Sequence, residues 1–207
     1  MEQDQPFEKD LASIHQLMER SVKFISLSGA AGILTGVYAL LGAGMAYVRI
    51  HNPESPFYYP VASMQAPRAM FELSMIGTVV LVLSLTTLFL MSNKKAKKLG
   101  ASIWDETGRR LMINLAIPLF TGGAFVLILL ASNHFGLAAP VCLIFYGLAL
   151  VNASPNLYDE YRYLGYLEIV LGLLGALMPG YGLLAWAIGF GVLHVVYGTL
   201  MYRRYEA

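Results

Sequence analysis

The chain has 207 residues, of which 57% are hydrophobic and 13% charged, and its formal net charge is +1. The mean hydropathy of +0.59 exceeds what a water-soluble domain of this size needs to fill one core, so the composition indicates a membrane protein. No stripe of Lys and Arg suits nucleic acid, and the single cysteine, Cys142, excludes an intrachain disulfide.

The first 22 residues predict a cytoplasmic amphipathic segment, and residues 23–207 predict one transmembrane domain. Apolar residues recur in the segment at steps of four, three and four, which predicts a striped helix. They are Phe7, Leu11, Ile14 and Met18. Such a helix fits the membrane interface. Its acidic residues favour the alternative, a docking site for a cytoplasmic protein partner.

Six apolar stretches follow, each close to the ~20 residues with which a helix crosses a lipid bilayer. They are Phe24–Tyr47, Met70–Ser92, Leu111–Ser132, Phe135–Ala153, Tyr161–Met178 and Tyr181–Tyr202. The predicted fold class is therefore all-α, a polytopic bundle of six transmembrane helices. Short turns join the third to the fourth stretch and the fifth to the sixth, which predicts two antiparallel hairpins.

Positive charge gathers between the second and third stretches. The residues are Lys94, Lys95, Lys97, Lys98, Arg109 and Arg110. The positive-inside rule places this loop in the cytoplasm. Alternation of six spans then puts both termini in the cytoplasm and the Asn52–Gln65 loop outside.

Small residues mark the faces on which these helices are expected to pack, because they let helix backbones approach closely in lipid. The predicted packing glycines are Gly32, Gly36, Gly165, Gly172, Gly175, Gly191 and Gly198. Whether such faces also join copies of the chain into a homo-oligomer stays open at this point.

Two ionisable residues, Glu168 and His194, share small-residue faces of the last two stretches. Both lie ~12 Å from the inner boundary at 1.5 Å per residue. Tyr146 comes to the same level, and Tyr197 flanks His194. These four form the candidate buried polar or proton-relay site, since ionisable side chains in a span are commonly functional. The alternative is that they only hold the helices together.

Motifs for catalysis are missing. Six spans with a histidine in the last are similar to the layout of rhomboid proteases, but the fourth stretch has no Gly-x-Ser-Gly nucleophile motif. Cys142 is expected in the outer half of its span, too far from His194 for a catalytic dyad. The sequence has no Walker loop and no HExxH. It predicts no catalytic residue, no metal site and no cofactor.

Four strings carry a resemblance. They are Met18–Gly29 (MERSVKFISLSG), Phe145–Ser154 (FYGLALVNAS), Tyr163–Glu168 (YLGYLE) and Ala187–His194 (AIGFGVLH). With them the chain resembles a family of uncharacterised six-span proteins of the bacterial inner membrane. The resemblance implies localisation in the cytoplasmic membrane and transfers no catalytic residue.

The sequence therefore leads to a multipass membrane protein without enzymatic activity, which senses or binds something or acts as a scaffold. The alternative is a small proton-coupled transporter or exporter that works through Glu168. A dry, packed bundle favours the first function, and a water-accessible cavity at Glu168 favours the second.

Overall fold

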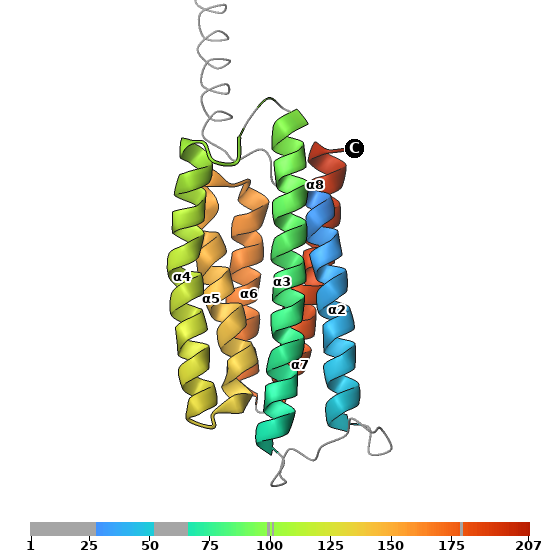
Figure 1. The fold of residues 1–207 in the computed structure, drawn as a ribbon, viewed down its shortest axis with the longest axis vertical. Coiled ribbons are helices and arrows are strands. Elements are labelled where there is room, and N and C mark those ends of the chain that lie inside the picture. Colours follow the sequence, from blue (N-terminus) through green and yellow to red (C-terminus); the bar gives the residue numbers. More distant parts are fainter. Residues whose placement is uncertain (1–27, 52–65, 99, 101, 179) are drawn as a thin grey trace, which may run out of the picture.

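The computed structural model describes residues 28–51, 66–98, 100, 102–178 and 180–207. Within them every regular element is helical, and the long helices stand side by side as a bundle (Figure 1). The elements are α2 (Gly29–His51), α3 (Ala66–Lys98), α4 (Glu106–Ala131), the 3-10 turn η1 (Phe135–Leu137), α5 (Ala138–Ala153), the 3-10 turn η2 (Ser154–Asn156), α6 (Asp159–Leu177), α7 (Gly182–Trp186), the π-helical segment η3 (Ala187–Leu193) and α8 (His194–Tyr205). The predicted amphipathic segment 1–22 and the loop Asn52–Gln65 lie outside the described residues.

The all-α prediction is confirmed for the described part of the chain, and five of its helical stretches are long and apolar enough to cross a membrane. These are Gly29–Ile50, Phe71–Lys98, Glu106–Ala131, Phe135–Asn156 and Gly182–Tyr205. The predicted fifth span, α6, does not reach the same standard of apolarity. Even its best stretch of 18 residues contains Glu160, Arg162 and Glu168.

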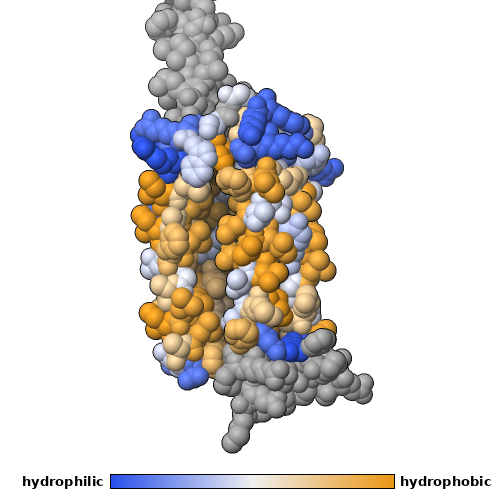
Figure 2. Space-filling view, in the orientation of Figure 1, coloured by the Kyte–Doolittle hydropathy of each residue, from blue (hydrophilic) through white to orange (hydrophobic). Residues whose placement is uncertain are grey.

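The surface of the bundle carries a hydrophobic band of the kind that lies against the lipid chains of a bilayer. Figure 2 shows a broad hydrophobic band across the visible face of the bundle, with hydrophilic residues gathered at its two ends. Helix α3 contributes strongly, since Phe71 is 69% exposed, Leu83 48% and Leu90 59%. Exposed apolar side chains over so long a helix would be unstable in water and are covered by lipid in a membrane.

The bundle consists of two groups of helices. In the first group α5 packs along both α4 and α6, and in the second α2 packs along both α3 and α8. The amino-terminal part of the last helical stretch, α7 and η3, contacts α2, α5 and α6 and joins the groups. The second predicted hairpin is present as a short turn, after which α7 and η3 contact α6. Its last part differs from the prediction, because α8 packs chiefly on α2.

Glycines make the closest helix contacts, as the physics of packing in lipid requires. A Cβ atom built on Gly172 would lie 2.7 Å from the Pro140 carbonyl oxygen of α5, and one on Gly198 would lie 2.5 Å from Ile33 N of α2. All seven predicted packing glycines lie at such helix–helix contacts. The sequence analysis missed Gly147, whose Cβ would lie 2.5 Å from the carbonyl oxygen of Gly165.

The carboxyl-terminal end of α8 ties both groups together. Glu206 accepts a hydrogen bond from Gly29 N of α2 at 2.6 Å and pairs with Lys95 of α3 at 2.9 Å. Arg204 pairs with Glu160 at the start of α6 at 2.8 Å. A negative charge beside the first backbone N–H groups of α2 also complements the dipole of that helix. The segment Arg204–Glu206 is therefore bonded to both helix groups: Glu206 pairs with α3 of the second group, and Arg204 pairs with α6 of the first.

Candidate functional site

Three polar side chains meet inside the bundle, each from a different helix. Tyr146 comes from the middle of α5, Glu168 from the middle of α6, and His194 from the junction of η3 and α8. The Glu168 side chain is fully buried and that of His194 is 11% exposed. The structure thus brings together three of the four residues predicted for the polar site, at the level where the two helix groups join.

The imidazole of His194 is held at both nitrogen atoms. Nδ1 lies 3.0 Å from the carbonyl oxygen of Gly189, and Nε2 lies 2.8 Å from the hydroxyl of Tyr146. A carbonyl oxygen can only accept, so Nδ1 carries the hydrogen. In the neutral ring Nε2 then accepts the hydrogen of the Tyr146 hydroxyl. Both ring positions are satisfied without Glu168.

The carboxyl group of Glu168 is enclosed but forms no hydrogen bond with any described residue. Its Oε1 lies 3.5 Å from Nδ1 of His194, whose hydrogen already points to Gly189. Its Oε2 lies against Gly189, where a Cβ atom would come within 2.4 Å of it. Gly189 therefore makes the space for the carboxyl group. A charged carboxylate without donors is very unfavourable in such surroundings.

The helix that carries His194 changes its hydrogen-bonding pattern at this place. Residues Ala187–Leu193 are π-helical, and the His194 ring binds the Gly189 carbonyl five residues earlier. Short π-helical segments inside α-helices are rare overall, and those that do occur are often found at functional sites. The sequence analysis missed both the π-helix and Gly189. The only sequence signal was the close pair Gly189 and Gly191, since two glycines weaken a regular helix.

Aromatic rings enclose the polar side chains. Phe190 lies with its ring centre 5.1 Å from that of Tyr146 and 5.9 Å from that of His194. Trp186 continues the cluster at 5.5 Å from Phe190. The rings are tilted, which is the arrangement that aromatic pairs prefer. They come from the last helical stretch and from α5, so they pack the two helix groups against one another at this junction.

Other predicted residues lie apart from this cluster. Tyr197 lies one turn beyond His194 along α8 and makes no hydrogen bond to the other three within the described chain. Cys142 is half-buried on α5, one turn before Tyr146. Across the described residues, no three His, Cys, Asp or Glu side chains converge as a metal ion requires.

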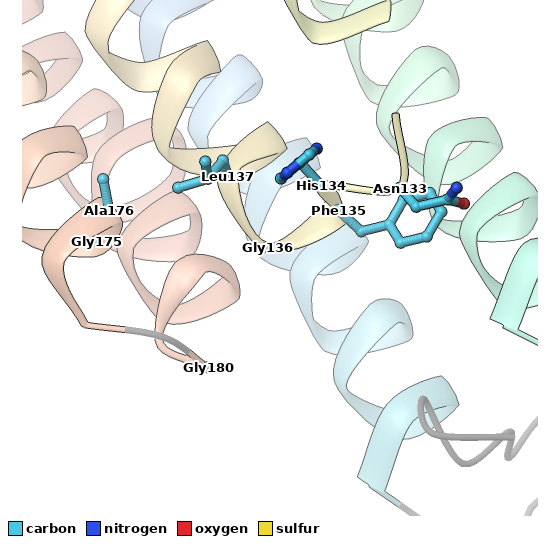
Figure 3. Close-up of a pocket in the computed structure, with 8 residues that line it drawn as sticks. All are labelled: Asn133, His134, Phe135, Gly136, Leu137, Gly175, Ala176 and Gly180. Atoms are coloured by element: carbon cyan, nitrogen blue, oxygen red, sulfur yellow. The ribbon is translucent and has the colours of Figure 1, made fainter. Parts of the chain in front are cut away.

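The two best-defined cavities lie at opposite ends of the bundle. One of about 260 Å³ lies between the turns that follow α4 and α6 (Figure 3). It is lined by Asn133, His134, Phe135, Gly136, Leu137, Gly175, Ala176 and Gly180. The second, of about 390 Å³, is lined by Glu160, Leu200, Arg203 and Arg204. Neither of these two cavities is lined by Glu168, His194 or Tyr146, and Glu168 itself is fully buried.

This arrangement can hold or release a proton, and neither of the two cavities described above borders it. Glu168 offers one exchangeable proton, and the neutral His194 offers a second group that could take one up. No protein-family model matches the chain, and neither does any characterised protein or solved structure with which it was compared.

Proposed function

We propose that the chain is a non-enzymatic, six-span protein of the bacterial inner membrane that senses or binds a ligand and relays the change to its cytoplasmic face. One observation carries the proposal. Glu168 is fully buried at the junction of the two helix groups, and its carboxyl group forms no hydrogen bond with the part of the chain that the structure describes. A change in proton occupancy there alters the electrostatic energy of both groups at once.

Helix α6 is proposed as the sixth crossing. Its 19 residues would span ~28 Å at 1.5 Å per residue, close to the thickness of the hydrocarbon. It packs along α5, which lies in a stretch apolar enough to cross. Glu160 and Arg162 lie in its first turn, where they reach the interface, and Glu168 is the one charged residue at depth.

The direction of the crossings follows from charge. Helix α3 ends with a basic segment, Lys94–Lys98, and α8 carries Arg203 and Arg204 in its last turn. The ion pair of Lys95 with Glu206 places these two helix ends together. The positive-inside rule favours this end for the cytoplasm. An even number of crossings then puts both termini there. The same end carries the ion pairs that link α8 to α3 and to α6, so a movement of η3 would reach the cytoplasmic face through α8.

A distance measurement tests the proposal. Spin labels are attached to Lys98→Cys of α3 and Arg162→Cys of α6, two exposed sites in different groups, in a Cys142→Ala background reconstituted in lipid. We expect the distribution of distances between the labels to change with pH. Glu168→Gln should abolish the change, because an amide keeps the shape of the side chain but cannot exchange a proton.

The control is Glu106→Gln, which removes a carboxylate that is 70% exposed and far from the cluster in the fold. It should leave the response to pH intact. A response that persists in Glu168→Gln contradicts the proposal, and so does a wild-type protein whose label distances do not change with pH.

A second candidate function is proton-coupled transport through Glu168. The π-helical segment beside an ionisable residue favours it, because both features are frequent where ions or substrates pass. Liposomes that contain the protein and a pH-sensitive dye distinguish the two functions. A proton flux that is present in the wild type and lost in Glu168→Gln would establish transport and refute a role restricted to sensing.

A further inference from the structure

Among the described residues, α3 and α4, the outer helices of the two groups, do not pack along one another. Helices α3 and α4 follow one another in sequence, yet α3 packs on α2 while α4 packs on α5. Figure 2 shows the surface hollowed between them along the bundle, and Figure 1 shows α5 and α6 behind this hollow. We call it the α3–α4 groove.

Exposed apolar side chains are frequent on the two helices that border the α3–α4 groove. On α3 they include Val82 and Phe89, and on α4 they include Ile117, Phe120 and Leu127, which is 68% exposed. The apolar part of α3, from Phe71 to Ser92, is ~33 Å long at 1.5 Å per residue. It therefore matches the hydrocarbon thickness and ends where the lysines begin.

One end of the groove is strongly positive. Lys94, Lys97 and Lys98 are exposed at the end of α3, and Arg109 is exposed in the first turns of α4. None of these four forms an ion pair with another described residue. Seven residues join α3 to α4 and reach at most roughly 25 Å, so the cations of both walls stay near one another.

We infer that the α3–α4 groove binds an anionic diacyl phospholipid, with its phosphate among the cations at the end of the groove and its acyl chains between α3 and α4. Basic pockets between transmembrane helices recognise anionic head groups, and apolar walls of this length accommodate acyl chains. This inference requires insertion in a membrane but does not depend on the role of Glu168.

Charge also disfavours a second copy of the chain as the occupant. In a membrane two copies insert in the same direction, so a two-fold contact through the groove would set the lysines of one copy against those of the other. Like charges held together are repelled, whereas a phosphate neutralises them. A lipid thus satisfies both the apolar walls and the charged end.

The test uses the purified full-length protein in neutral detergent, titrated with dioleoylphosphatidylglycerol or dioleoylphosphatidylcholine and followed by native mass spectrometry. The test variant combines Lys94→Gln with Arg109→Gln, one from each wall. Its apparent Kd for the anionic lipid should rise on the order of 30-fold, since each cation near the head group contributes substantially. The matched control removes two exposed cations that lie on neither wall helix, Arg162→Gln of α6 with Arg203→Gln of α8, and should change that Kd far less.

A photoactivatable phosphatidylglycerol with its reactive group in an acyl chain tests the position of the lipid. It should label α3 and α4 above the other helices, and high salt should reduce this preference. Equal affinity for the two lipids, equal losses in the test and control variants, or even labelling of all helices overturns the inference. Cross-linked dimers through α3 and α4, or a cross-link of residues 1–22 to the α3 lysines that excludes the lipid, would identify another occupant and also overturn it.

Discussion

Replacing Gly172 by alanine should destabilise the bundle, although alanine is the better helix former. The new Cβ atom would lie 2.7 Å from the Pro140 carbonyl oxygen and 3.0 Å from Ile144 N, both on the α5 backbone. Backbone atoms cannot rotate away, so α5 and α6 must separate by several tenths of an ångström. A gap of that size forfeits a large part of each dispersion contact between the helices. We expect a loss of about 1–3 kcal/mol in the free energy of unfolding.

Unfolding by a denaturing detergent, followed by circular dichroism in mixed micelles, measures this loss. Gly123→Ala of α4 is the matched control, because a Cβ atom there meets no atom within 4 Å. It should be neutral or stabilising by up to about 1 kcal/mol, the helix-propensity gain of alanine over glycine. Leu173→Ala, at a side chain that is 51% exposed, should cost less than Gly172→Ala. A Gly172→Ala protein as stable as the wild type, or a Gly123→Ala protein destabilised equally, would refute the packing argument.

Three further predictions address the polar cluster of Glu168, the contacts of Glu206 after α8, and the membrane topology. Tyr146→Phe should lower the free energy of unfolding by about 1 kcal/mol, because it leaves Nε2 of His194 without its donor; no loss in the same assay would contradict the hydrogen bond. Glu206→Gln should weaken the hold on Lys95 and the α2 amino terminus and lower the melting temperature most at low salt, whereas an equal effect at all salt concentrations would exclude an ionic role. Reporter fusions after the last residue and in the loop between α3 and α4 should behave as cytoplasmic, and fusions between α2 and α3 as external; the opposite pattern would exclude the proposed topology.

Much of the fold could be predicted because the sequence of each long helix by itself indicates that helix. Long apolar runs mark the crossings, and regularly spaced small residues mark their contact faces. The same local logic placed Glu168 and His194 near each other, since both lie on small-residue faces at similar depth. It was less decisive for α6, where Glu160, Arg162 and Glu168 lower the apolar signal that a crossing normally gives.

The parts that sequence reasoning missed depend on contacts between distant segments. The short turn after α6 predicted that the last helical stretch returns along α6, which holds for α7 and η3 but not for α8, whose main partner is α2. Gly198 fits closely against the backbone of α2, and this contact draws α8 away. Likewise a regular α-helix would place Gly189 away from the face that carries Gly191 and His194. The π-helical turn changes that register and presents Gly189 to Glu168 instead.

The central claim is that Glu168 is a protonatable group buried at the junction of the two helix groups. Infrared difference spectroscopy of the wild type against Glu168→Gln tests this claim most directly. In a dry site without hydrogen-bond donors the account predicts the carbonyl band of a neutral carboxylic acid in the wild type, absent from the variant and slow to shift in heavy water. A carboxylate band at neutral pH instead, or a carbonyl band that shifts at once in heavy water, would show a solvated side chain and contradict the account.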